Sequence, residues 1–148
     1  MNGRIKDNGM SPSEIFLEER PPMAEELSSL RAAVGWTNPE LSIIESSINS
    51  SLFWVSIFQS DRLVACGRVI GDGSMYFYVQ DVIVHPEFQK LGLGSKIMQS
   101  INGFLSSNCH SGSTVGLLAA KGKEDFYLKH GFALRNGKDL SLGMCRFI

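Results

Sequence analysis

The chain has no apolar run long enough to cross a membrane and no strong charge of either sign. Its apolar-rich stretches, such as 52–58, are far shorter than the roughly 20 residues that span a bilayer. The N-terminus lacks the apolar core of a signal peptide. A formal net charge of -1 gives no basic field of the kind that nucleic-acid binders use. We therefore expect a cytoplasmic protein with neither a membrane nor a nucleic acid as its partner.

Cysteine is scarce, and its spacing is uninformative for disulfides or metals. Cys66, Cys109 and Cys145 are odd in number, far apart and in no C-x-x-C pair, which argues against a disulfide framework or a thiolate metal site. His110 and His130 have no partners at metal-ligand spacing. We expect no metal.

Length and composition favour a single folded domain. The chain has 148 residues, of which 43% are hydrophobic and 20% are charged, so it can bury one core. The polar first residues predict a flexible N-terminal lead-in over 1–12. Residues 13–148 then form one domain in this prediction.

Hydrophobic periodicity predicts a mixed order of strands and helices. Leu27, Leu30 and Val34 recur at helical spacing, and Asn38 followed by Pro39 is typical of a helix start. The expected helices are 23–34, 39–49, 94–107 and 124–129. The expected strands are 15–19, 52–58, 63–70, 75–84 and 114–119, with one or two more from Ala133 onward.

A glycine-bearing turn stands between the strand 75–84 and the helix that follows it. Gly92 and Gly94 let the backbone turn tightly and approach a ligand closely, and the helix start presents unpaired N–H groups. Together these features favour a bound pyrophosphate. The segment lacks the G-K-[ST] ending of a nucleoside-triphosphate loop and contains no G-x-G-x-x-G, which excludes both of those nucleotide motifs.

Two motifs in the right order resemble one known family. Gln89-Lys90-Leu91-Gly92-Leu93-Gly94 matches the signature Q/R-x-x-G-x-G/A of the GCN5-related N-acetyltransferase (GNAT) superfamily. The segment 80–87 looks like that family's central strand with its V-x-P-E exit, and 126–132 is similar to its F-Y-x-x-x-G-F element. Residues 31–36 also resemble a V-G-W segment of small members.

The resemblance covers nearly the whole chain and implies a fold. The implied class is α+β, a layered α/β/α arrangement with a mixed, mostly antiparallel sheet of six or seven strands. About four helices flank that sheet, and its central strands splay apart.

The resemblance also implies a reaction, in which an acetyl group passes from acetyl-CoA to a primary amine by direct attack in a ternary complex. The backbone N–H near Val82 would stabilise the developing oxyanion. The positions that match the family's cofactor contacts are Val82, Ile83 and Val84 for the pantetheine arm, Gln89, Lys90, Leu91, Gly92, Leu93, Gly94 and Ser95 for the pyrophosphate, and Tyr127.

Two side chains are candidates for proton transfer. Tyr127 matches the family's general acid and could protonate the departing CoA sulfur, although a tyrosine packed on a short helix is the alternative. Asp81 could act as the base, directly or through a water chain, or could hold a loop by hydrogen bonds. His85, which precedes a proline at the strand exit, is expected to pack at the turn.

The acceptor is the least readable part of the sequence. Trp36, Tyr76 and Tyr78 could form an aromatic wall for an arylalkylamine, but core packing explains them as well. Amino sugars, polyamines and protein amines stay open. Apolar residues near Met144 could serve a homodimer. An acyl-CoA-binding regulatory or interaction module without turnover and a binding domain without a CoA site are the alternative functions.

Overall fold

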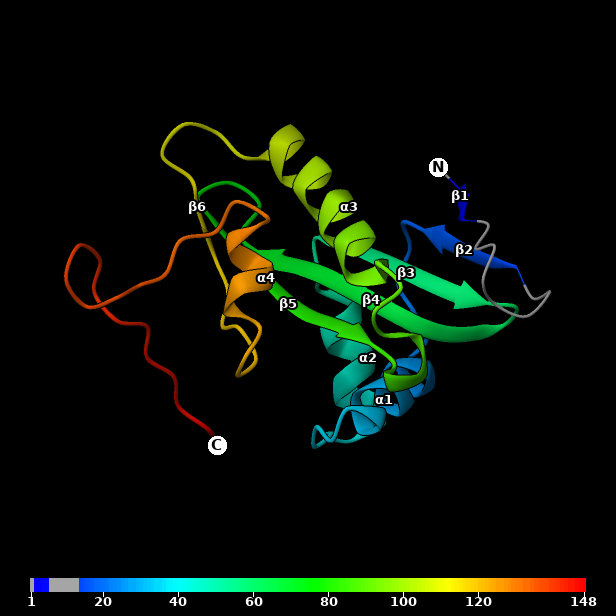
Figure 1. Ribbon diagram of the computed structural model, residues 1–148. Helices are drawn as coiled ribbons and strands as arrows, with labels where there is room; N and C mark the ends of the chain where they lie inside the picture. Colours follow the sequence, from blue (N-terminus) through cyan, green and yellow to red (C-terminus); the bar gives the residue numbers. More distant parts are fainter. Residues whose placement is uncertain (1, 6–13) are drawn as a thin grey trace. The chain divides into compact units, whose positions relative to one another are not determined.

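The computed structural model describes residues 2–5 and 14–148 (Figure 1). The chain divides into two compact units, Met1–Gly116 and Leu117–Ile148. The first unit contains the sheet and three of the α-helices, and the second contains one short helix.

The first unit is built on a six-stranded sheet in the order β1-β2-β3-β4-β5-β6. Every neighbouring pair is antiparallel except β5 and β6, which are parallel, so the predicted mixed and mostly antiparallel sheet is confirmed. The strands are β1 (Asn2–Ile5), β2 (Ile15–Glu18), β3 (Phe53–Gln59), β4 (Arg62–Gly71), β5 (Tyr76–Val84) and β6 (Thr114–Gly116).

Helices cover both faces of this sheet, with α1 and α2 on one face and α3 on the other (Figure 1). The division follows from β4, where Cys66 contacts the α1–α2 side and the next residue, Gly67, lies under α3. Successive residues of a strand point to opposite faces. The helices are α1 (Ala24–Ala33), α2 (Leu41–Asn49), α3 (Leu93–Asn108) and, in the second unit, α4 (Glu124–Leu128), with a short 3-10 helix, η1, at Pro86–Phe88.

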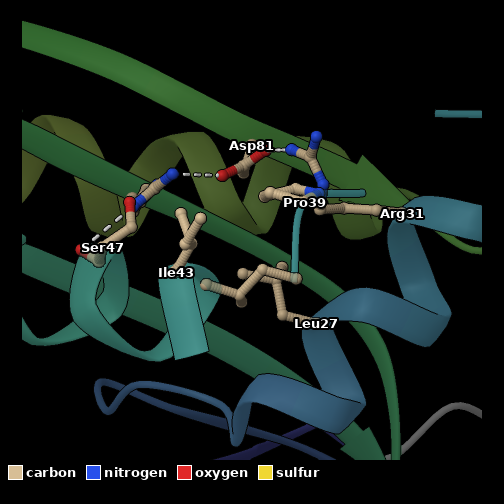
Figure 2. Close-up of a pocket in the computed structure, with 8 residues that line it drawn as sticks. Leu27, Arg31, Pro39, Ile43, Ser47 and Asp81 are labelled. Carbon is tan, nitrogen blue, oxygen red and sulfur yellow. Dashed lines mark hydrogen bonds and ion pairs between the residues drawn. The ribbon is translucent and has the colours of Figure 1, made fainter. Parts of the chain in front are cut away.

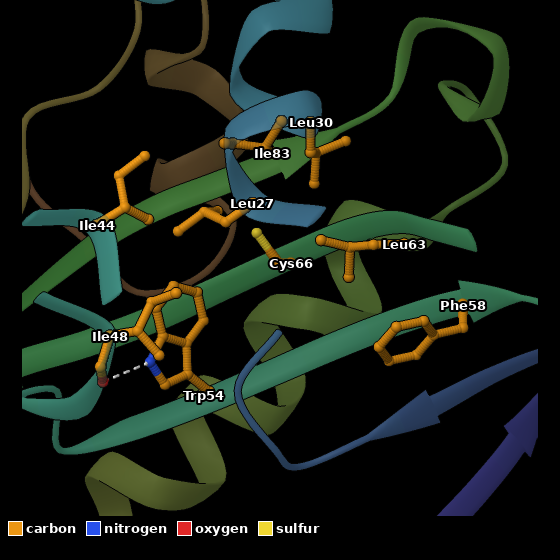
Figure 3. Close-up of a cluster of buried hydrophobic side chains, with 9 residues drawn as sticks. All are labelled: Leu27, Leu30, Ile44, Ile48, Trp54, Phe58, Leu63, Cys66 and Ile83. Atoms are coloured by element: carbon orange, nitrogen blue, oxygen red, sulfur yellow. Dashed lines mark hydrogen bonds between the residues drawn. The ribbon is translucent and has the colours of Figure 1, made fainter. Parts of the chain in front are cut away.

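The α1–α2 face encloses a buried hydrophobic cluster (Figure 3). The indole N–H of Trp54 donates a hydrogen bond of 3.3 Å to the Ile48 carbonyl, which satisfies the polar atom of this large side chain. The cluster comprises Leu27, Leu30, Ile44, Ile48, Trp54, Phe58, Leu63, Cys66 and Ile83. It fixes the two helices against β3, β4 and β5.

The other face depends on a close approach of α3 to β4. A Cβ atom on Gly67 would lie only 2.6 Å from Cγ2 of Ile97 and 2.9 Å from Cδ1 of Ile101. Both isoleucines are fully buried, so neither can move aside easily. Glycine at this position therefore sets how deeply the helix packs.

The start of α2 differs from the sequence prediction. The helix begins at Leu41 after Glu40, and Asn38 does not cap it. The Asn38 amide instead accepts a hydrogen bond of 2.8 Å from Nε of Arg31 and donates one of 2.9 Å to the Ser28 carbonyl. Tertiary partners thus compete successfully with the local capping role.

The two ends of the chain also differ from expectation. Residues 2–5, which fall in the expected flexible lead-in, pair with β2, and the rest of that lead-in lies outside the described residues. The prediction of strands from Ala133 onward is wrong, because α4 is the one regular element of 117–148. The backbone after α4 forms a local turn instead, in which the Gly137 N–H donates to the Leu140 carbonyl over 2.7 Å.

We predict that Gly67→Ala lowers the free energy of unfolding by about 1–3 kcal/mol, because the added methyl overpacks the contact with α3. Gly103→Ala is the matched control, since Gly103 lies in α3 itself and a Cβ atom there would meet nothing within 4 Å. That control should raise the stability by about 0.5–1 kcal/mol. Urea denaturation of both variants measures the difference, and equal effects would contradict the proposed packing.

Candidate functional site

Strand β5 is paired on both edges only along its first part. β6 pairs with Tyr76, Phe77 and Tyr78, and no strand of the described chain pairs with 79–84 on that side. The opposite edge is paired with β4 up to Val84. This divergence is the splay that the family resemblance implied, and it leaves the β6-facing edge of 79–84 without a strand partner in the described chain, as pairing with an extended ligand would require.

A β-bulge lies in the middle of this free stretch. The ladder pairs on either side of it are Arg68 with Gln80 and Cys66 with Ile83. Asp81 and Val82 therefore share one opposing residue, Gly67, so β5 carries one residue more than β4 here. Asp81 has a φ of 50°, a left-handed conformation that is uncommon outside glycine. Backbone outliers of this kind cluster at functional sites.

The side chain of Asp81 is completely buried between two arginines (Figure 2). Nη1 of Arg31 lies 2.5 Å from Oδ1, and Nη2 of Arg68 lies 2.8 Å from Oδ2. The second contact is an ion pair whose direction departs from that of a good hydrogen bond. Because accepting a proton would disrupt an ion pair, this geometry favours the structural reading of Asp81 over the base.

The same arginines also bind the helical layer. Nη2 of Arg31, which belongs to α1, donates to the Thr37 carbonyl over 3.1 Å in the loop before α2. Nη1 of Arg68, on β4, donates to Oγ of Ser47 in α2 over 2.8 Å and to Oγ of Ser51 over 3.1 Å. The α1–α2 layer and the bulge are thus connected through two guanidinium groups.

The thiol of Cys66 completes the contacts of the bulge. It donates to the backbone carbonyl of Asp81 at an S–O distance of 3.3 Å. Burial, followed by the nearby Asp81 carboxylate, raises the pKa of this thiol far above its usual value. Cys66 therefore stays neutral and keeps the proton that it donates.

A cavity of about 140 Å³ lies behind the bulge, between α1, α2 and the sheet (Figure 2). Its apolar wall consists of Leu27, Pro39, Ile43 and Ile44. Its polar wall consists of Arg31, Ser47, Arg68 and Asp81. Two guanidinium groups and one carboxylate give this wall an excess of positive charge.

Hydrogen bonds of the Gln89 and His85 side chains hold the backbone in place where β5 ends. Nε2 of Gln89 donates to the Val84 carbonyl over 3.0 Å, which ties the turn back to the strand. Nδ1 of His85 accepts from the Glu87 N–H over 3.2 Å, and Nε2 of His85 lies 2.9 Å from Nη2 of Arg62. His85 thus packs at the turn, as expected.

The turn then leads into an uncapped helix start. Lys90 and Gly92 have φ values of 64° and 80°, and Gly92 is the N-cap of α3 without any side-chain hydrogen bond. A Cβ atom on Gly92 would meet nothing within 4 Å, so this backbone is open to a ligand. Leu93 is buried and anchors the first turn, which also contains Gly94 and Ser95. Such a helix start attracts anions.

Tyr127 lies in the second unit, on α4, among other aromatic rings. Its ring is edge-to-face with Phe126 at 5.1 Å between centroids and with Phe132 at 6.1 Å. The side chain is half-buried, and this burial raises the pKa of the phenol. The hydroxyl consequently keeps its proton at neutral pH and can donate it.

The three aromatic residues of the predicted acceptor wall lie on different parts of the first unit. Trp36 packs against the hydrophobic cluster, with the Arg31 guanidinium 5.3 Å above its ring. Tyr76 and Tyr78 lie at the β6-paired start of β5, where Tyr76 is 60% exposed. The aromatic wall stays a prediction.

Sequence reasoning missed the roles of Arg31, Arg68 and Cys66. One signal was available, because Arg68 is a charged residue inside an otherwise apolar strand, and such a residue is rarely buried without a partner. Nothing local in the sequence indicates which carboxylate pairs with it.

No group of three His, Cys, Asp or Glu residues among those described could hold a metal ion. No helix in the described part of the chain is both long and apolar enough to cross a bilayer.

Comparison with known proteins identifies the family. Residues 49–134, more than half of the chain, match the acetyltransferase (GNAT) domain family. The chain belongs to the GNAT family. The GNAT match includes the bulge of β5, the turn before α3, and α4.

Two relatives by sequence come from Porphyra purpurea and Prochlorococcus marinus. The uncharacterized N-acetyltransferase ycf52 of Porphyra purpurea is 34% identical over 112 residues, which are 72% of this chain and 63% of the relative. A ycf52-like N-acetyltransferase of Prochlorococcus marinus is 30% identical over 81% of this chain and 68% of the relative. The chain thus spans about two thirds of the length of these proteins.

The crystal structure of SA2161 from meticillin-resistant Staphylococcus aureus, named a probable acetyltransferase, is also similar. It superimposes with a TM-score of 0.81 at 26% identity and covers 89% of this chain and 99% of its own. The fold predicted from the family resemblance is therefore confirmed.

We predict that Cys66 resists alkylation by iodoacetamide in the folded protein, even at pH 9–10, where an ordinary thiol with a pKa near 8.5 is ionised. Cys145, which is exposed, should react at once and is the internal control. Mass spectrometry of tryptic peptides measures both rates. Modification of Cys66 as fast as Cys145 would show that the thiol is not held in the bulge.

Proposed function

We propose that this GNAT domain binds acetyl-CoA and transfers its acetyl group to a primary amine by direct attack in a ternary complex. The observation that carries the proposal is the continuity of the free edge of β5 with the uncapped start of α3. An extended pantetheine arm needs backbone partners like those of a strand, and a pyrophosphate needs converging N–H groups. One short stretch of chain offers both.

The residues of this stretch fit the cofactor. Val82, Ile83 and Val84 lie on the free edge, and the open backbone at Gly92 leaves room for phosphate oxygens. Gln89 holds the turn, and the amides from Lys90 to Ser95 follow it. When bound there, acetyl-CoA supplies an activated thioester.

Two groups of the chain would assist the transfer. The backbone N–H of Val82, in the bulge, would donate a hydrogen bond to the thioester oxygen as negative charge develops on it. The protonated phenol of Tyr127 would give its proton to the departing sulfur. Neither role needs Asp81 to change its protonation.

The acceptor amine would enter from the α1–α2 side, through the cavity behind the bulge. Because the cavity wall carries two arginines and one aspartate, it disfavours an ammonium ion and favours the neutral amine that can attack. In this proposal the positive wall accepts no proton but favours a neutral amine, and the proton that the amine nitrogen loses after attack passes to solvent water.

We predict that acetyl-CoA at about a hundred times its Kd raises Tm by about 5–10 °C. Gly92→Asp should abolish the shift, because it places a side chain and a negative charge where the phosphates bind. Gly112→Asp is the matched control, a positive-φ glycine with equally open surroundings in the loop between α3 and β6. Differential scanning fluorimetry measures the Tm of the wild type and both variants with and without acetyl-CoA.

The same proteins separate the proposal from its alternatives. Absence of any shift in the wild type would support a binding domain without a CoA site. A clear shift without release of CoA from acetyl-CoA in the presence of tyramine, spermidine, glucosamine or a lysine peptide would support an acyl-CoA-binding module.

We predict that Tyr127→Phe lowers kcat about a hundredfold or more and leaves acetyl-CoA stabilisation unchanged, because only the proton donor is lost. In the wild type, kcat should fall only above pH 10, since burial raises the pKa of the phenol and the protonated form persists to higher pH. The fall should be absent in the variant. Thiol-detected CoA release across pH measures both effects, and an unchanged kcat in Tyr127→Phe would remove the residue from the mechanism.

A further inference from the structure

We infer that Asp81 is a positioning residue whose buried carboxylate, held by Arg31 and Arg68, fixes the left-handed bulge and thereby directs the Val82 N–H toward the free edge of β5. The inference rests on the proposed function, because it names what places the proposed hydrogen-bond donor. It concerns the backbone conformation at 81–82 and assigns no proton transfer to Asp81.

The conformation of Asp81 requires something to hold it. A φ of 50° brings the Cβ atom of an L-residue into a crowded arrangement that glycine avoids. Aspartate tolerates this region better than most residues, yet it still pays a cost relative to an extended strand. The surrounding structure must therefore over-determine the bulge.

The side chain provides that restraint from two elements. Arg31 reaches the carboxylate from α1, and Arg68 reaches it from β4. The side chain of Asp81 has no exposure at all, while those of the arginines are 19% and 11% exposed. Releasing the carboxylate would leave charges buried without their partner, which is strongly unfavourable.

The carbonyl of Asp81 fixes the orientation of the next N–H. The Cys66 thiol, on the α1–α2 face of β4, donates to this oxygen over 3.3 Å, so the carbonyl is turned toward the β4 side of β5. The peptide between Asp81 and Val82 is trans and planar, and its N–H consequently points the opposite way. Away from β4 lies the edge of β5 that has no strand partner in the described chain.

Three substitutions at Asp81 separate positioning from base catalysis. Glycine and asparagine adopt positive φ more readily than alanine, but none of the three side chains is a carboxylate. We expect kcat and acetyl-CoA affinity to follow the order Asn, then Gly, then Ala, with Ala at least about tenfold below Gly. Equal loss in all three, whatever the backbone preference of the new residue, would overturn the inference in favour of a base.

A second pair of variants tests the arginine contact without touching β5. Arg31→Gln should weaken acetyl-CoA binding more than CoA binding, because the thioester oxygen is the group that meets the Val82 N–H. Arg20→Gln is the matched control, since Arg20 is also ion-paired, to Glu18, but lies away from the bulge. Isothermal titration calorimetry gives both affinities. Equal behaviour of the two variants would overturn the inference.

A ligand-free measurement keeps the inference distinct from the proposed function. Backbone NMR shifts and couplings of residues 81 and 82 should report a left-handed conformation in the wild type, a partly populated one in Asp81→Asn and Asp81→Gly, which lack the carboxylate but tolerate positive φ, and loss of it in Asp81→Ala. An unchanged conformation in a folded Asp81→Ala overturns the inference even if the enzyme is active. If the conformation changes as expected but no wild-type turnover is found, the proposed transfer fails and the positioning of the bulge stands.

Discussion

The ion pairs of the Asp81 carboxylate with Arg31 and Arg68 are the interaction on which the candidate site depends. A buried charge is tolerated only when its partners are in place, so these three residues fix one another. Their backbones belong to α1, β4 and β5, and the arginines also bind the loop before α2 and the helix itself. These contacts therefore fix the position of the α1–α2 layer relative to the bulge of β5.

Close packing on the opposite face complements this polar contact. Gly67 lies opposite the bulge in the ladder and directly under α3, so one residue without a side chain accommodates both the extra residue of β5 and the approach of the helix. Because Ile97 and Ile101 are buried there, the start of α3 is placed relative to the end of β5 by core packing rather than by its turn alone.

Local patterns predicted most of the regular elements. The apolar runs that became β3, β4 and β5 were predicted within about two residues, as was the helix after the glycine turn, because alternation and helical spacing depend on neighbouring residues. Asn38 was misassigned because its side chain hydrogen-bonds with the Arg31 guanidinium and the Ser28 carbonyl instead of capping α2. The predicted terminal strands were wrong because a strand requires a partner edge, which no local pattern specifies.

By itself the sequence determined the family, the strand-turn-helix segment and the glycine-bearing turn within it, since these reside in contiguous residues such as 80–94. Only the tertiary structure decided that Asp81 is buried, that its backbone is left-handed, and that Arg31 and Arg68 hold it. Arg31 and Asp81 are 50 positions apart, and desolvation becomes decisive only once the core around them has closed. The identity of a buried ion pair is therefore a property of the fold.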